Sequence, residues 1–149
     1  MIELSDEIGR FDLDRIHGWL ANSYWSPGLA RDAFERQFAN SHNLGAYDAE
    51  ARQVGYARVI SDKATFAWLA DVIVDEAARG KGIGRSLVRW FLDHPHYASV
   101  RRFALVTADA HGVYAALGFH SPLRPERYME RLSADFAARI DPGMPDRRA

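Results

Sequence analysis

Residues 72–85 read VIVDEAARGKGIGR, and this stretch decides the fold. An apolar run typical of a strand comes first, a basic turn with alternating glycines follows, and a pattern typical of a helix comes last. Such a turn binds phosphate, because glycine lets the backbone approach closely, N–H groups point at the anion and the helix dipole favours negative charge. The stretch therefore predicts a phosphate-binding turn between a strand and a helix.

The rest of the pattern predicts an α/β domain with a mixed sheet. Asp12 is placed to cap a first helix, and Ser26-Pro27 is typical of the start of a second. The helix after the glycines buries Ile83, Leu87 and Phe91 and ends before Pro95. We expect strands at 44–47, 54–60, 65–74 and 103–107, a short helix at 110–117 capped by Gly118, and closing strands at Phe119 and 128–132.

Composition indicates one soluble domain over residues 1–140 with a flexible tail at 141–149. The chain has 149 residues, a net charge of -1 and no cysteine, and 48% of its residues are hydrophobic. Near-neutral charge gives no reason to expect nucleic acid or a membrane as partner. The absence of cysteine, of a signal peptide and of a long apolar run favours a cytoplasmic protein. The lack of cysteine also excludes a thiol nucleophile and a cysteine-based metal site, and we expect no metal.

Two common phosphate-binding motifs fail on spacing. A dinucleotide fingerprint needs Gly-x-Gly-x-x-Gly after the first strand of a βαβ unit, whereas this turn has Gly-x-Gly-x-Gly in mid-chain. A nucleotide P-loop needs Gly-Lys-Ser/Thr, and Lys81 lies between two glycines. A nucleotide-dependent enzyme is therefore a poor third hypothesis.

Arg79-Gly80-Lys81-Gly82-Ile83-Gly84 closely resembles the pyrophosphate loop of the GNAT superfamily of N-acetyltransferases, Arg/Gln-x-x-Gly-x-Gly/Ala. A second segment, residues 110–119 (AHGVYAALGF), is similar to the family pattern Ala-x-x-x-Tyr-x-x-x-Gly-Phe. Where the family often has asparagine, seven residues before the tyrosine, this chain has Thr107. The resemblance covers roughly residues 54–132 and implies a mostly antiparallel sheet, flanked by helices and splayed between the fourth and fifth strands.

The resemblance also implies an acetyl-CoA site. The fourth strand would pair with the pantetheine arm, the glycine turn would bind the pyrophosphate, and the segment before the second motif would support the cofactor. The expected cofactor-binding residues are Val72, Ile73, Val74, Arg79, Gly80, Lys81, Gly82, Ile83, Gly84, Arg85, Thr107 and Ala110.

By the same resemblance, Tyr114 is the general acid that protonates the departing thiolate, with aromatic packing as the alternative. Asp71 lies in an apolar run, where a carboxylate is either functional or paired, so it is the best candidate for a general base, with a salt bridge or a bond to a loop as the alternative. Tyr24, Trp25 and Trp68 are candidates for the acceptor pocket or for the core.

The function that follows is transfer of the acetyl group of acetyl-CoA to a primary amine, on a small molecule, a peptide or a protein, by direct attack in a ternary complex. The alternative is a catalytically silent domain that binds coenzyme A as a sensor or scaffold. Either a monomer or a homodimer is compatible with the sequence.

Overall fold

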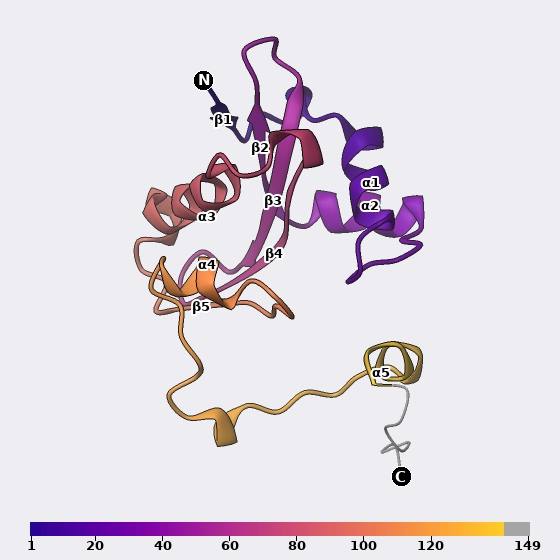
Figure 1. Cartoon of the computed structure of the whole chain (residues 1–149). Coiled ribbons are helices and arrows are strands. Elements are labelled where there is room, and N and C mark those ends of the chain that lie inside the picture. Colours follow the sequence, from indigo (N-terminus) through magenta and orange to yellow (C-terminus); the bar gives the residue numbers. More distant parts are fainter. Residues whose placement is uncertain (142–149) are drawn as a thin grey trace. The chain divides into compact units, whose positions relative to one another are not determined.

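The computed structural model describes residues 1–141. The chain divides into two compact units, and the boundary along the sequence falls between Gly118 and Phe119. The first unit contains a five-stranded sheet in the order β1-β2-β3-β4-β5 (Figure 1). Its strands are β1 (Glu3–Ser5), β2 (His42–Tyr47), β3 (Gln53–Ser61), β4 (Phe66–Val74) and β5 (Arg102–Ala104). Neighbouring strands are antiparallel except β4 and β5, which are parallel. The expected mixed, mostly antiparallel sheet is confirmed.

Helices cover both faces of this sheet (Figure 1). Those of the first unit are α1 (Leu13–Ala21), α2 (Arg31–Ala39), α3 (Ile83–Asp93) and α4 (His111–Ala115). Tyr56 of β3 is fully buried with residues of α1 and α2. A Cβ on the preceding residue, Gly55, would contact Ile83 and Leu87 of α3. Because strand side chains alternate between faces, β3 separates the α1/α2 layer from the α3 layer.

Helix boundaries follow local chemistry in two places and depart from expectation in a third. The Asp12 carboxylate accepts a hydrogen bond from the Arg15 N–H and caps α1, and α3 ends at Asp93, before Pro95. The expected helix start at Ser26-Pro27 is wrong, because α2 begins at Arg31. Gly28 has a left-handed φ of 69°, which a continuous right-handed helix from Pro27 does not allow.

The sheet opens between β4 and β5. Only three residue pairs join these strands, from Phe66↔Arg102 to Trp68↔Ala104. The expected strand at 103–107 therefore ends early, at Ala104, while β4 continues to Val74. The expected splay is present, and it leaves the last six residues of β4 unpaired on the side of β5.

A β-bulge lies in the same part of β4. Tyr56 pairs with Ile73 and Arg58 pairs with Ala70, so the single residue Ala57 lies opposite both Asp71 and Val72. Asp71 takes a positive φ of 55°, an uncommon conformation for a residue with a side chain. The bulge increases local twist and redirects the side chains that follow it.

The second unit begins at Phe119. It contains a 3₁₀ turn at Pro125–Arg127 and α5 (Ala134–Ile140), which the sequence analysis did not predict. The strands expected at Phe119 and 128–132 are wrong, because both segments lie outside any strand. Pro122 and Pro125 interrupt this region and cannot donate to a sheet ladder. Of the expected tail, residues 142–149 lie outside the described residues. Within the described range, no helix has the length and hydropathy needed to cross a bilayer.

Candidate active site

The glycine turn presents a row of backbone donors. Gly80 and Gly82 have φ angles of 80° and 77°, and Gly82 directly precedes α3. Within the part of the chain that the structure describes, the N–H groups of residues 80–85 donate no hydrogen bond, and the first donor of the helix is the Ser86 N–H, which bonds to Gly82 O. Consecutive free N–H groups at the positive end of a helix form a binding site for an anion.

Glycine is needed in this turn for its backbone conformation. A Cβ on Gly80 or Gly82 would meet nothing within 4 Å, and a Cβ on Gly84 would make only ordinary contacts with Val72 and Val74 at 3.7 Å or more. The left-handed φ at the first two positions is the actual constraint. The glycines are therefore required by the backbone conformation of the turn rather than by internal packing.

The cations of the turn are differently placed. Arg79 folds back, and its Nε donates to Val74 O over 3.1 Å, which ties the turn to the end of β4. Lys81 and Arg85 are exposed. Their exposure makes them accessible to a phosphorylated ligand, and the structure gives neither of them an ion pair with another described residue.

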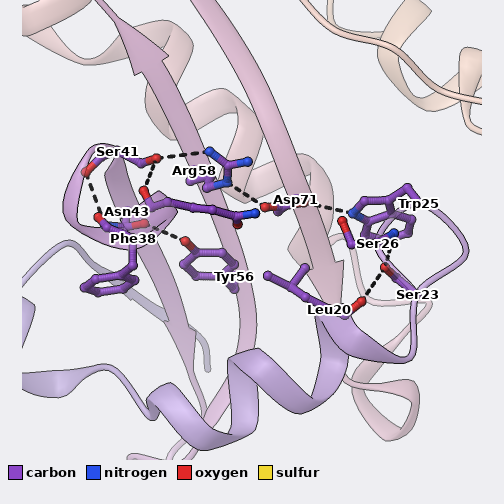
Figure 2. A network of polar contacts seen from close by, with 11 residues as sticks. Leu20, Ser23, Trp25, Ser26, Phe38, Ser41, Asn43, Tyr56, Arg58 and Asp71 are labelled. Carbon is purple, nitrogen blue, oxygen red and sulfur yellow. Dashed lines mark hydrogen bonds and ion pairs between the residues drawn. The ribbon is translucent and has the colours of Figure 1, made fainter. Parts of the chain in front are cut away.

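Asp71 is the centre of a buried polar network on the α1/α2 side of the sheet (Figure 2). Its side chain is 5% exposed and forms an ion pair with the Arg58 guanidinium, Nε to Oδ2, at 2.5 Å. The other carboxylate oxygen accepts a hydrogen bond from Trp25 Nε1 over 2.8 Å. Both structural alternatives for Asp71, a salt bridge and a bond to a loop, are therefore realised together.

Arg58 is the residue that sequence reasoning missed. Its side chain is only 12% exposed, and its NH1 group also donates to Ser41 Oγ over 3.1 Å. Next to it on the same face of β3, Tyr56 donates from its hydroxyl to Asn43 Oδ1 over 2.5 Å. Burial raises the pKa of Tyr56 well above its usual value. An arginine at an inward position of an apolar strand was the available signal, because a buried guanidinium requires a carboxylate partner.

The loop between α1 and α2 carries two aromatic residues over this network. Trp25 reaches down to Asp71, and Tyr24 packs edge-on against Trp25 with ring centroids 5.0 Å apart. The Tyr24 hydroxyl lies 3.4 Å from both the Asp109 carboxylate and the Ala108 N–H, in the loop before α4. These two side chains therefore connect one loop to β4 and to the start of α4.

Trp68 lies on the same side of the sheet. It pairs in register with Ile60, and residues paired across two strands share a face. Ile60 alternates with Arg58 and Tyr56, so Trp68 belongs to the face that α1 and α2 cover. Tyr24, Trp25 and Trp68 thus come from the elements of one side, although Trp68 is six residues nearer the N-terminus of β4 than Val74.

Tyr114 lies on α4, in the second sequence segment. Burial is the main cause that raises the pKa of its hydroxyl, and the neighbouring Tyr24 and Asp109 add to the effect. The Thr107 hydroxyl accepts a hydrogen bond from the Ala110 N–H over 3.1 Å, which fixes the entry into α4. The helix is shorter than expected: it ends at Ala115 with Ala116 as its C-cap, and Gly118, with a left-handed φ of 92°, lies in the turn that follows. A tyrosine in this setting stays protonated at neutral pH and can donate a proton.

The family model for the acetyltransferase (GNAT) domain matches residues 40–121, which include the opened sheet, the glycine turn and α4. The chain belongs to the GNAT acetyltransferase family. Its expected class, an acyltransferase, is thereby confirmed.

Three similar proteins are named as acetyltransferases. A solved GNAT-family protein from Xanthomonas campestris pv. campestris is 38% identical, with a TM-score of 0.85 over 89% of this chain and 94% of that one. Glucosamine 6-phosphate N-acetyltransferase 1 of Oryza sativa subsp. japonica is 29% identical over 109 residues, 63% of this chain and 66% of the rice enzyme. The solved glucosamine-6-phosphate N-acetyltransferase of Arabidopsis thaliana, at 17% identity and a TM-score of 0.65, shares the fold over 89% of this chain and 98% of that one.

Proposed function

We propose that this protein transfers the acetyl group of acetyl-CoA to a primary amine on a small molecule, by direct attack in a ternary complex. The single observation that carries the proposal is the pairing of the free N–H groups of residues 80–85 with the opening between β4 and β5. The first suits a pyrophosphate and the second suits an extended, peptide-like arm that can hydrogen-bond to a strand.

The donor-binding residues fit such a ligand by their own chemistry. Arg79 holds the turn against Val74, and Lys81 and Arg85 add accessible positive charge beside the free N–H groups. Val72, Ile73 and Val74 offer backbone groups on the unpaired side of β4. Acetyl-CoA, when bound, supplies the activated acyl group as a thioester, and an N–H of this strand would polarise its carbonyl. Thr107 and Ala110 act by fixing the start of α4.

Tyr114 is proposed as the general acid. Its raised pKa keeps the hydroxyl protonated, so that it can deliver a proton to the departing sulfur as the neutral amine attacks and the C–S bond breaks. The proton that the amine nitrogen then loses passes to solvent, from which the tyrosine is reprotonated. In Tyr114→Phe we expect unchanged binding of acetyl-CoA and a kcat lowered by about 10²–10⁴-fold, the usual contribution of a positioned acid. The measurement is thiol release with a panel of amines, alongside calorimetric titration of acetyl-CoA.

Asp71 is proposed as a positioning residue rather than the general base. Both of its oxygens are engaged, by Arg58 and by Trp25, and the contact to Trp25 holds the loop between α1 and α2 on the sheet. If Asp71 only positions Trp25, the substitution Trp25→Phe raises the KM for the amine. It then leaves the acid limb of the pH profile of kcat/KM in place. If Asp71 is the base, Asp71→Asn removes that limb.

The acceptor is sought among small amines because the rice relative is named for glucosamine 6-phosphate. The panel therefore includes glucosamine 6-phosphate, glucosamine, a polyamine and a peptide with a free amino terminus. Tyr24, Trp25 and Trp68 are the proposed acceptor-side residues. Turnover of the peptide alone would overturn the small-molecule assignment.

The silent coenzyme A-binding domain is the second candidate. The engagement of both Asp71 oxygens favours it, because this carboxylate is then not available to deprotonate an amine. Tight binding of acetyl-CoA without thiol release on the whole panel would support it. Absence of binding would contradict both candidates.

A further inference from the structure

Two imidazoles and a carboxylate converge at the far end of α3 from the glycine turn. Asp6 follows β1, His42 begins β2 and His94 directly follows α3. One ligand atom from each lies within 4.8 Å of the others. We call Asp6, His42 and His94 the His–Asp cluster. None of the three belongs to the proposed acetyl-transfer site.

The cluster is close to the size of a metal site. His42 Nε2 lies 2.8 Å from Asp6 Oδ2, and the rings of His42 and His94 are nearly perpendicular with centroids 5.3 Å apart. Ligands around a tetrahedral Zn²⁺, bound at about 2.0–2.1 Å, are separated by roughly 3.3 Å. A small movement of the His94 ring toward Asp6 and His42 would bring all three atoms to that separation.

His42 is oriented as a metal-binding histidine is oriented. Its Nδ1 lies 2.6 Å from the Tyr97 hydroxyl, which leaves Nε2 directed at Asp6. A tyrosine hydroxyl can either donate or accept a hydrogen bond. With a metal on the Nε2 lone pair, the ring proton would lie on Nδ1, and the Tyr97 oxygen would accept a hydrogen bond from this N–H. Metal-bound histidines are held by such a contact to the second nitrogen.

His94 can become a metal ligand after one local rearrangement. Its Nδ1 accepts a hydrogen bond from the His96 N–H over 3.1 Å, and its ring packs on Trp90. Binding of a metal at Nε2 moves the ring proton to Nδ1 and releases the His96 N–H. Because His96 is exposed, that N–H then bonds to water.

Solvent reaches the cluster from two sides. A hollow of about 410 Å³ is lined by Trp90, Asp93 and His94, and a second of about 390 Å³ is lined by Ser41, His42 and Tyr97. Asp6 is nearly half-exposed, with a side-chain accessibility of 46%, whereas His42 is at 15%. A hydrated ion therefore has an entry path to ligands that are already partly desolvated.

We propose that Asp6, His42 and His94 bind a divalent transition-metal ion such as Zn²⁺, with water completing the coordination. Two imidazoles and one carboxylate suit this class of ion rather than Ca²⁺ or Mg²⁺, which prefer oxygen ligands. The ion would join the segment after β1, the start of β2 and the end of α3. Its role is structural, and it does not depend on the proposed acetyl transfer.

The test uses the full chain without a histidine tag, after treatment with a chelator. Zn²⁺ is followed by calorimetry and by the melting temperature, and Co²⁺ by its visible absorption. We expect one ion per chain, a Co²⁺ spectrum of four-coordinate character and a melting temperature that rises with Zn²⁺. Absence of stoichiometric binding at micromolar Zn²⁺ would overturn the proposal.

Variants separate a built site from binding at scattered surface groups. His94→Gln and Asp6→Asn should each weaken Zn²⁺ by more than the roughly 10–100-fold expected for loss of a supporting partner, and Tyr97→Phe should weaken it within that range. His120→Gln removes an exposed histidine outside the cluster and should change nothing. Melting of each metal-free variant establishes that it is folded. Equal Zn²⁺ affinity in wild type, His94→Gln and Asp6→Asn would contradict the assignment.

Discussion

The two sides of the proposed active site are built in opposite ways. The donor side is a continuous stretch, residues 79–85, in which the backbone N–H groups of residues 80–85 donate no hydrogen bond to another described residue. On the acceptor side, Trp25 is held in place by a buried network whose side chains come from separate elements: Trp25 itself from the α1–α2 loop, Arg58 from β3 and Asp71 from β4. The first depends on local φ angles and the second on tertiary packing. Substitutions should therefore change ligand affinity on one side and stability on the other.

The largest effect is expected from removing the charge of Asp71. In Asp71→Asn the amide keeps an acceptor for Trp25 and tolerates the positive φ, but buried Arg58 loses its counter-ion. Breaking a buried ion pair in this way lowers the free energy of unfolding by about 3–5 kcal/mol. Urea denaturation measures the loss. The double variant Arg58→Gln/Asp71→Asn should lose less than the sum of the singles, and strict additivity would show that the two side chains are not coupled.

A smaller loss of stability is expected from Trp25→Phe. The change removes the indole N–H that donates to Asp71 but keeps an aromatic ring. A hydrogen bond to a charged group contributes about 1.5–3 kcal/mol, and the free energy of unfolding should fall within or below that range. Acetyl-CoA affinity should be unchanged, as measured by calorimetry. A loss of donor affinity as large as the loss of stability would contradict the separation of the two sides.

The donor side should show the reverse. Gly82→Ala forces a side chain into the left-handed region at a strain of about 1–2 kcal/mol, while its Cβ meets no neighbour. We expect acetyl-CoA affinity to fall roughly tenfold as the exposed turn relaxes and its N–H groups turn away.

Gly18→Ala is the matched control for Gly82→Ala, because its Cβ also meets no neighbour but it lies inside α1 with no positive φ. It should stabilise the protein by about 0.5–1 kcal/mol and leave acetyl-CoA affinity unchanged. Equal effects of the two substitutions on affinity would show that the left-handed turn is not what binds the donor.

The smallest effect is expected from a substitution of Asp109. This residue lies in the loop before α4, and its carboxylate is 3.4 Å from the hydroxyl of Tyr24 on the acceptor side. Its negative charge contributes, after burial and Tyr24, to the raised pKa of Tyr114. Asp109→Asn removes a like charge and lowers that pKa, so the alkaline limb of the kcat profile should move to lower pH. A profile measured from pH 7 to 11 in both proteins checks this. A limb that moves to higher pH would contradict the sign of the interaction.

This contrast explains how far the sequence could be interpreted. Strands β2 to β4, α3 and the glycine turn were predictable because strand alternation, helical spacing and left-handed glycines are properties of neighbouring residues. The partner of Asp71 was not, because Arg58 is 13 residues away and meets it only through the register of β3 and β4.

Three features of the structure could not be predicted from the sequence, for related reasons. β1 has only three residues, too few to show an alternating pattern. Pro27 indicated a helix start that the left-handed Gly28 prevents. The His–Asp cluster joins positions 6, 42 and 94, and such separations leave no local metal-binding motif.

The opening between β4 and β5 also affects how the protein behaves without its acyl donor. A strand whose hydrogen-bonding edge is unpaired is a template for another chain, and proteins usually shield such edges. Here the last six residues of β4 form that edge inside the sheet rather than at its rim. The arm of the donor would act as the missing shield. We therefore expect the protein to self-associate more readily when it is stripped of acetyl-CoA than when it is saturated with it.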